Sequence, residues 1–173
     1  MIDNVYIGLG SNLGDREHQL LAALESLSHI DAAAVLRCSS LYESAPVGPP
    51  QPRYLNAVVE LECALAPLSL LAIIKQIELD LGRTKSERWG ARAIDLDILL
   101  WGDQVIAEAQ LQIPHLELHR RRFALEPLCE LIPTAVHPVL GEKMGELLER
   151  VQLQDVVKLN SSEWPYESAG QDP

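Results

Sequence analysis

The sequence predicts an α+β fold in which helices pack on an antiparallel sheet, and three observations support this prediction. The chain has 173 residues, which is enough for one domain with a buried core. Its composition is that of a globular protein, with 47% apolar and 23% charged residues. Strand-like and helix-like segments alternate along the chain, and neither an internal repeat nor a second domain is visible.

The first half of the chain predicts a strand, a helix and two more strands. Residues 4–9 (NVYIGL) form the first predicted strand, which ends near two glycines. Asp15 can cap the following helix, where leucines recur at helical spacing. We expect the next strands at about 34–43 and at 54–65, because the proline-rich segment 46–52 between them cannot be regular structure.

The next predicted elements are a helix and a strand that ends in a turn. Pro67 is tolerated in a first helical turn, and Gly82 is a natural stop. Between them lies one apolar face at helical spacing: Leu70, Ile74, Ile77 and Leu81. Residues 94–101 predict a strand, and the Gly-Asp pair at 102–103 predicts a turn to a hairpin partner near 105–106.

The predicted order strand, helix, strand, strand, helix, strand is the split βαβ pattern of a ferredoxin-like sandwich. We therefore predict a ferredoxin-like βαββαβ sandwich with an antiparallel sheet and additional C-terminal helices. One such helix is expected at 123–132, despite Pro127. We expect residues 1–160 to form a single domain, and 161–173, which are polar with Gly and Pro, to form a flexible tail.

Charge and composition exclude several classes of protein. The net charge of −11 disfavours a nucleic-acid binder, which needs a broad basic surface. No apolar run approaches the ~20 residues needed to span a bilayer, and we see no secretory leader at the N-terminus. The three cysteines are widely spaced, which argues for reduced thiols rather than disulfides. We therefore expect a cytoplasmic protein without nucleic-acid or membrane partners.

The strand predicted at 94–101 carries two carboxylates in an otherwise apolar segment. Asp95 and Asp97 are two residues apart and project from the same face of the strand. Its apolar residues are expected to project from the other face: Leu96, Ile98 and Leu100. Taken alone, the Asp pair fits a solvated edge strand better than a functional site. It also offers the hard oxygen ligands that Mg²⁺ prefers.

A charged, irregular segment at 83–93 leads into this strand. It brings four cations towards the strand end that carries the carboxylates: Arg83, Lys85, Arg88 and Arg92. A second basic patch lies at 120–122, so seven of the fourteen Lys and Arg residues fall in two short patches. This concentration of cations in an acidic chain indicates a compact polyanion, such as a nucleoside triphosphate. Cations beside paired carboxylates are what phosphoryl transfer needs.

Common nucleotide-binding motifs are absent from the sequence. The chain has no Gly-x-x-x-x-Gly-Lys-Ser/Thr P-loop and no protein-kinase signature. Gly8, Gly10 and Gly14 weakly resemble a dinucleotide fingerprint, but the last spacing is wrong and no parallel α/β pattern follows. A site for ATP in this chain would therefore be of another type.

The stretch from Glu87 to Ile98 (ERWGARAIDLDI) strongly resembles the signature of the hydroxymethyldihydropterin pyrophosphokinase family. Further family segments follow in the right order: GSNLG at 10–14, YLNA at 54–57, IE at 77–78 with GR at 82–83, and IPH at 113–115. The resemblance implies a ferredoxin-like, monomeric enzyme that uses ATP and two Mg²⁺ ions. Such an enzyme transfers pyrophosphate from ATP to the hydroxymethyl group of 6-hydroxymethyl-7,8-dihydropterin in folate biosynthesis, and it releases AMP.

The resemblance also implies roles for individual residues. It gives catalytic roles to Arg83, Arg92, Asp95 and Asp97, and it places both metal ions on the two Asp residues. The implied nucleotide contacts are Glu78, Lys85, Arg88, Ile98, His115 and Arg121. The implied pterin contacts are Ser44, Val47, Tyr54, Asn56, Trp89 and Phe123. Tyr54 and Phe123 would form the two sides of a stacking slot for the flat ring.

Three positions depart from the usual residues of the family. Ala45 replaces a Pro, Lys75 replaces a Gln, and Leu116 replaces an aromatic residue. We expect none of them to touch the metal or phosphate residues.

Two other classes of protein stay open. The first is a catalytically inactive ferredoxin-like module that binds a metabolite, which would not need an Asp pair beside four cations. The second is an RNA-binding sheet domain. It would need exposed aromatic residues and a basic face, whereas this chain has one Phe and a net charge of −11.

Overall fold

The computed structural model describes residues 1–83 and 90–165 of the chain. In these residues, six strands form one antiparallel sheet in the order β5-β1-β4-β3-β8, and β2 also pairs with β4. The strands are β1 Asp3–Ser11, β2 Ala33–Cys38, β3 Leu41–Ser44, β4 Tyr54–Cys63, β5 Asp95–Trp101 and β8 Val156–Leu159. A separate two-stranded sheet contains β6 Ile106–Ala107 and β7 Gln112–Ile113.

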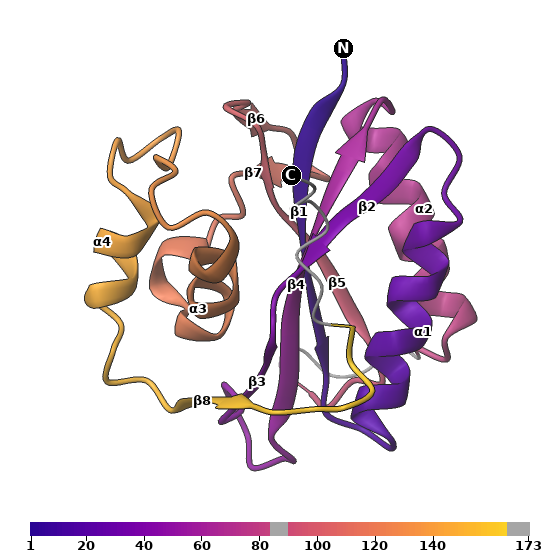
Figure 1. Cartoon of the computed structure of the whole chain (residues 1–173), viewed down its shortest axis with the longest axis vertical. Coiled ribbons are helices and arrows are strands. Elements are labelled where there is room, and N and C mark those ends of the chain that lie inside the picture. Colours follow the sequence, from indigo (N-terminus) through magenta and orange to yellow (C-terminus); the bar gives the residue numbers. More distant parts are fainter. Residues whose placement is uncertain (84–89, 166–173) are drawn as a thin grey trace, which may run out of the picture.

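Helices cover both faces of the large sheet (Figure 1). Helices α1 (Arg16–Ser28) and α2 (Pro67–Asp80) lie on one face, and α3 (Arg122–Leu131) and α4 (Met144–Glu149) lie on the other. A short 3-10 helix, Leu118–Arg120, comes directly before α3. None of the helices in the described ranges is both long and apolar enough to cross a membrane.

Each face of the sheet has its own apolar core, because successive residues of a strand point to opposite faces. In β1, Val5, Ile7 and Leu9 belong to the core beneath α1 and α2. Tyr6, between them, belongs to the core beneath α3 and α4. The chain is therefore a mixed α/β protein with an antiparallel sheet and several helices, as the sequence predicts.

Strand β5 contains an irregularity that the sequence did not indicate. Ile7 of β1 is opposite Ile98, whereas Tyr6 is opposite Leu100, so Leu99 is an extra residue in β5. After this bulge, each side chain of β5 points to the face opposite to the one that strict alternation predicts. Leu100 therefore joins Leu99 in the core beneath α3, and our expectation that it shares a face with Leu96 and Ile98 is wrong.

The single strand predicted at 34–43 is two strands in the structure. The ladder breaks at Ser39, whose side-chain Oγ accepts the hydrogen bond from the backbone N–H of Val58 at 2.9 Å. At the next residue, the backbone N–H and hydroxyl of Ser40 both donate to Glu130 of α3. Serine side chains that replace ladder partners in this way interrupt a strand. The break also anchors α3 to the sheet.

The hairpin predicted after β5 is also wrong. Residues Ile106–Ala107 do form a strand, β6, but it pairs with β7 and not with β5. The turn at Gly102 does exist, and its backbone N–H donates to the carbonyl of Asn4 in β1 at 2.9 Å. This bond extends the pairing of β5 with β1 by one residue, and the segment after the turn pairs with β7 away from the large sheet.

Parts of the C-terminal segment 150–165 pack against the domain. Strand β8 pairs with β3, and the backbone N–H of Ala45 donates to the carbonyl of Asp155. Trp164 is only 4% exposed, and its indole N–H donates to the carbonyl of Ser39 at 2.8 Å. Residues 161–165 thus lie against the domain, and the flexible tail expected at 161–173 stays a prediction. Its last part, 166–173, lies outside the described residues.

Candidate active site

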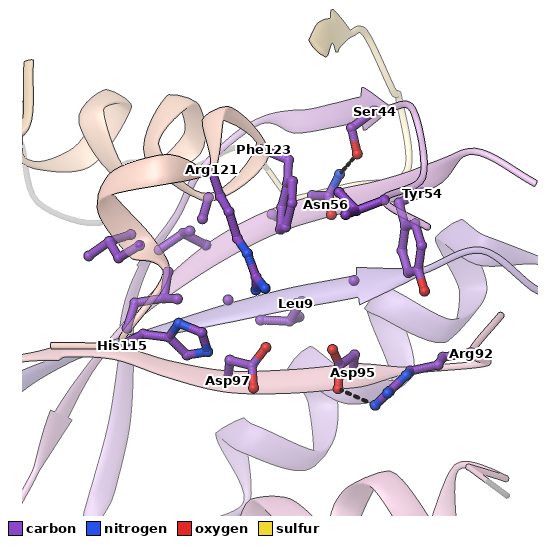
Figure 2. Close-up of a pocket in the computed structure, with 18 of the residues that line it drawn as sticks. Leu9, Ser44, Tyr54, Asn56, Arg92, Asp95, Asp97, His115, Arg121 and Phe123 are labelled. Atoms are coloured by element: carbon purple, nitrogen blue, oxygen red, sulfur yellow. Dashed lines mark hydrogen bonds and ion pairs between the residues drawn. The ribbon is translucent and has the colours of Figure 1, made fainter. Parts of the chain in front are cut away.

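The largest concentration of candidate residues lines a cavity of about 310 Å³ on the α3 face of the sheet. Strands β5, β1 and β4 form its floor, and α3 with the segment before it forms one wall (Figure 2). Eleven residues predicted from the sequence line this cavity: Ser44, Val47, Tyr54, Asn56, Arg83, Arg92, Asp95, Asp97, His115, Arg121 and Phe123. A volume of this size is at the lower end of the range for small-molecule sites.

Two glycines of β1 make room for the cavity. Gly8 is opposite Asp97, and Gly10 is opposite Asp95, so both lie in the floor. A Cβ atom at Gly8 would be 3.3 Å from the side chain of Leu99, and one at Gly10 would be 3.4 Å from Oδ1 of Asn56. Because any side chain at these positions would fill the floor, glycine leaves the backbone open to a ligand.

The two carboxylates of β5 lie side by side at one end of the cavity and point into it (Figure 2). An Nη atom of Arg83 is 3.3 Å from Oδ1 of Asp95, and an Nη atom of Arg92 is 3.5 Å from the same oxygen. Burial and the nearby charge of Asp95 raise the pKa of Asp97 to about 6. Desolvation is the larger of these two causes, and Lys75, Arg121 and Arg83 oppose the rise.

This pair of carboxylates fits a hard divalent cation such as Mg²⁺. Within the described ranges, the structure has no group of three or more His, Cys, Asp or Glu side chains that could hold a metal alone. Mg²⁺ commonly binds one or two carboxylates and completes its coordination with water and substrate phosphates. Asp95 and Asp97, in an open cavity beside cations, suit that mode of binding.

Behind the carboxylates, a buried cluster connects α2 to β5. Glu78 is 1% exposed, and its Oε1 accepts a 2.6 Å hydrogen bond from the backbone N–H of Leu96. Its other contacts are Lys75, at 3.2 and 3.3 Å from the two oxygens, and the guanidinium of Arg83. Burial raises the pKa of Glu78, and Lys75 with the Leu96 N–H opposes that rise. Glu78 does not line the cavity, so we expect it to hold Arg83 and not to touch a nucleotide.

Asn12 holds the backbone of Arg92 in place. Its side-chain oxygen accepts from the N–H of Arg92 at 2.7 Å, and its own N–H donates to the carbonyl of Arg92 at 3.0 Å. Its amide nitrogen donates to Gln51 and to the carbonyl of Pro52. Asn12 is 2% exposed, and its side-chain amide connects the segment at Arg92 to the segment at 51–52. Sequence reasoning placed Asn12 in a family motif but gave it no role.

His115 and Arg121 approach the carboxylates from the α3 side (Figure 2). The backbone N–H of His115 donates to the carbonyl of Leu99 at 2.9 Å, which fixes the residue against β5. Its Nδ1 accepts from the N–H of Glu117 at 3.2 Å, so the ring proton is on Nε2. Burial and the charge of Arg121 lower the pKa of His115. The imidazole is thus a neutral N–H donor at neutral pH.

The other end of the cavity is aromatic. Phe123 and Tyr54 face it from two sides, and Arg121 lies 5.7 Å from the centre of the Phe123 ring (Figure 2). Between them, the side-chain amide of Asn56 donates to Ser44 at 2.8 Å and to the carbonyl of Tyr42 at 3.2 Å. These bonds use both amide hydrogens of Asn56 and orient its carbonyl oxygen. The result is a slot between two rings with fixed polar groups at its inner edge.

Among the described residues, two candidates from the sequence, Ile98 and Glu78, do not bring their side chains to this cavity. Ile98 is 3% exposed in the core beneath α1 and α2, because it points away from the carboxylates, so only its backbone could contact a ligand. Glu78 is in the buried cluster described above. Lys85, Arg88 and Trp89 lie outside the described residues.

Lys75 is the charged residue that sequence reasoning missed. It lines the cavity, and its ammonium contacts Glu78, which the resemblance names as a nucleotide contact. The sequence did carry a signal, because a lone Lys three residues before a Glu on an apolar helix is a candidate ion pair. Leu116, by contrast, is 65% exposed, and Ala45 lines the cavity.

Cations and paired carboxylates at one end, and a slot between aromatic rings at the other, suit an enzyme that brings a polyphosphate against a flat heteroaromatic ligand. The class that this geometry favours is a small-molecule phosphotransferase without a P-loop.

Comparisons with known proteins identify the family within this class. The model of the 7,8-dihydro-6-hydroxymethylpterin-pyrophosphokinase (HPPK) family matches residues 6–133. A Haemophilus influenzae protein named 2-amino-4-hydroxy-6-hydroxymethyldihydropteridine pyrophosphokinase is 42% identical over 156 residues, which are 90% of this chain and 97% of that protein. The chain therefore belongs to the 7,8-dihydro-6-hydroxymethylpterin-pyrophosphokinase family.

Two longer proteins contain a similar segment. The Schizosaccharomyces pombe folic acid synthesis protein fol1 is 40% identical over 152 residues, 87% of this chain and 21% of that protein. The crystal structure of a Plasmodium falciparum HPPK-DHPS triple mutant matches 87% of this chain with a TM-score of 0.70. This chain spans 43% of that structure and shares 17% identity with it, so this likeness supports the fold alone.

Proposed function

We propose that this protein transfers a pyrophosphoryl group from ATP to the hydroxymethyl group of 6-hydroxymethyl-7,8-dihydropterin, in folate biosynthesis. Its family membership and its relatives, which are named as pyrophosphokinases of this pterin and as a folic acid synthesis protein, support this reading. The observation that carries it is the single cavity in which a carboxylate pair with cations meets a slot between two aromatic rings.

The reaction joins the two ends of the cavity. The pterin hydroxyl oxygen forms a bond to the β-phosphorus of ATP, the bond from that phosphorus to the AMP oxygen breaks, and the hydroxyl proton is released. Phosphoryl transfer needs mainly alignment and charge neutralisation. Arg83 and Arg92 lie within 3.5 Å of Asp95, where they could neutralise charge that develops on the transferred group and on AMP.

We propose that Asp95 and Asp97 hold the two Mg²⁺ ions that accompany ATP. When bound, the ions would neutralise phosphate charge and help to align the attacking and leaving oxygens. The protein's own contribution is to keep both carboxylates on one face of β5 beside Arg83 and Arg92. The raised pKa of Asp97 supports this assignment, because a bound cation would offset both the burial of this carboxylate and the charge of Asp95.

For the nucleotide, we propose that His115 donates from Nε2 to a phosphate oxygen and that Arg121 binds a neighbouring oxygen. Both residues line the cavity close to the carboxylates. Lys85 and Arg88 would add further phosphate contacts, Trp89 would close over the site, and Ile98 could contribute through its backbone.

For the pterin, we propose stacking between Tyr54 and Phe123. The carbonyl of Asn56 would accept from the ring edge, because both amide hydrogens of Asn56 are already bound. Ser44 holds Asn56 in this orientation, and Val47, which is 54% exposed, would cover the outer edge of the ring. A flat heteroaromatic ring gains from offset stacking and from burial in such a slot.

We further propose that the βαββαβ part of the chain is a ferredoxin-like sandwich within a single domain of residues 1–160. The strand order β5-β1-β4-β3, with α1 and α2 on one face, supports this topology. The family resemblance also supports a cytoplasmic monomer, and light scattering would measure the oligomeric state.

The dependence of ATP consumption on the pterin tests this proposal. Purified protein with ATP and Mg²⁺ should consume ATP only when 6-hydroxymethyl-7,8-dihydropterin is present. The 6-methyl analogue, which lacks the attacking hydroxyl, should bind but support no turnover. Binding of both ligands without any turnover would favour the second candidate, a catalytically inactive metabolite-binding module.

A further inference from the structure

Lys75 has a position that neither the family signature nor the proposed reaction assigns. Its side chain is 45% exposed and lines the cavity, yet its ammonium lies 3.2 and 3.3 Å from the two oxygens of Glu78. It also donates to the carbonyl of Leu96 at 3.3 Å. Lys75 is thus fixed between helix α2 and strand β5, at the back of the phosphate end.

The partner of Lys75 is the buried carboxylate of Glu78. This carboxylate also contacts Arg83, which lines the cavity. The side chain of Glu78 is 2% exposed, so its charge needs compensation. The same Nη atom of Arg83 that contacts Glu78 is 3.3 Å from Asp95. Arg83 therefore bridges the buried cluster and the carboxylates that line the cavity.

Because Arg83 contacts Glu78, any movement of Arg83 towards a phosphate removes a partner from a buried carboxylate, which costs free energy. If Arg83 were the only cation beside Glu78, its transfer to a ligand would leave a buried carboxylate with a single N–H partner. Loss of one partner from a buried ion pair is strongly destabilising. Lys75 contacts both oxygens of Glu78, so the carboxylate stays compensated when Arg83 leaves.

We propose that Lys75 is a positioning residue. It remains in contact with Glu78 and neutralises its charge, so that Arg83 can move from Glu78 to the nucleotide phosphates. The inference rests on the proposed role of Arg83 in neutralising charge on the transferred group and on AMP, which requires its guanidinium to reach the phosphates of ATP. It assigns Lys75 no contact with the ligand, and it gives a role to the cation at this position.

A double-mutant cycle tests this role. Binding of the unreactive analogue α,β-methylene-ATP, with Mg²⁺, is measured by calorimetry for the wild type, Lys75→Met, Glu78→Gln and the double variant. We expect Lys75→Met to weaken binding roughly five- to tenfold, as is common for residues coupled in one network. In the Glu78→Gln background, where no buried charge needs Lys75, the same substitution should change binding less than about twofold.

Two further variants keep the test valid if Glu78→Gln folds poorly. Arg83→Ala should also abolish the effect of Lys75→Met on analogue binding, because no arginine remains to be released. Lys75→Arg should restore most of the affinity, because it keeps the charge. Gln76→Met, which changes the next and exposed residue of α2, is the matched control. It should bind the analogue as tightly as the wild type does.

Other results would overturn the inference. If Lys75→Met weakens binding equally in the Glu78→Gln and Arg83→Ala backgrounds, Lys75 contacts the nucleotide directly. If it lowers the melting temperature without changing affinity, its role is structural only. If the wild type does not bind the analogue at all, the proposed function itself fails, and the inference fails with it.

Discussion

At the scale of single residues, charge balance decides how the cavity works. Asp95, Asp97 and Glu78 bring three carboxyl groups close together, and Lys75, Arg83 and Arg92 lie among them. Asp97 is nevertheless left with a pKa of about 6, because it is buried and faces Asp95. The metal-free protein therefore carries an unfavourable charge at this position at neutral pH, which is what a cation-binding site requires.

Asp97→Asn should separate the effect of this charge on folding stability from its effect on catalysis. Because the pKa of Asp97 is about 6 in the fold against an ordinary 3.8, the folded protein keeps a proton that the unfolded chain loses between these values. The stability of the metal-free wild type should thus fall as pH rises through this window. Asp97→Asn removes that fall and should stabilise the metal-free protein at pH 8 by ~1–3 kcal/mol.

Thermal unfolding at pH 4, 6 and 8 without Mg²⁺ measures this effect, and steady-state kinetics measures its functional counterpart. Asp97→Asn should lower kcat/KM at least ~100-fold, as is typical when charge stabilisation of a transition state is lost. Asp103→Asn, on the exposed turn after β5, is the control and should change neither property. Ordinary turnover by Asp97→Asn at ordinary Mg²⁺ would remove Asp97 from the metal site.

Phe123→Leu should affect the pterin and not the nucleotide. The substitution keeps an apolar side chain in the slot but removes the ring that would stack on the pterin. The KM for the pterin should rise about three- to tenfold. The KM for ATP should stay within about twofold, as for a change that removes binding to one substrate only. Phe123→Tyr should retain the wild-type KM, and a rise in both KM values would show that Phe123 shapes the whole cavity.

At the scale of elements, the sequence predicted most of the order correctly and failed where side chains replace backbone partners. Asp15 does cap α1, and α3 does form at 122–131 around Pro127. The strand at 34–43 was divided by Ser39 and Ser40, whose hydrogen bonds to Val58 and Glu130 depend on residues far away in the chain. Such tertiary contacts, and the extra residue Leu99 in β5, leave no local pattern to read.

The C-terminal segment gives a prediction at this scale. Trp164 is buried against the break between β2 and β3, so Trp164→Ala should lower the free energy of unfolding by ~2–4 kcal/mol. Denaturant unfolding measures this loss, and Glu163→Ala, at an exposed neighbouring position, is the control. The kcat of the folded variant should be unchanged, because Trp164 does not line the cavity. No loss of stability would mean that the segment is only loosely attached.

At the scale of the whole molecule, the architecture explains why one small domain can hold two different ligands. The antiparallel sheet supplies a rigid floor with glycines at Gly8 and Gly10, and α3 supplies the aromatic wall. The family resemblance named eleven of the residues that line the cavity, because it concerns mostly residues with direct chemistry. It could not predict Lys75, Asn12 or the glycine floor, which act by positioning other groups.

The identity of the nucleotide product is the most direct test of the central claim that both ligands react within this one cavity. Protein, ATP, Mg²⁺ and 6-hydroxymethyl-7,8-dihydropterin are mixed, and the nucleotides and pterins are separated and quantified over time. We predict AMP in a one-to-one ratio with pterin pyrophosphate. ADP with a pterin monophosphate would contradict the account, because it would mean that the γ-phosphorus and not the β-phosphorus is attacked.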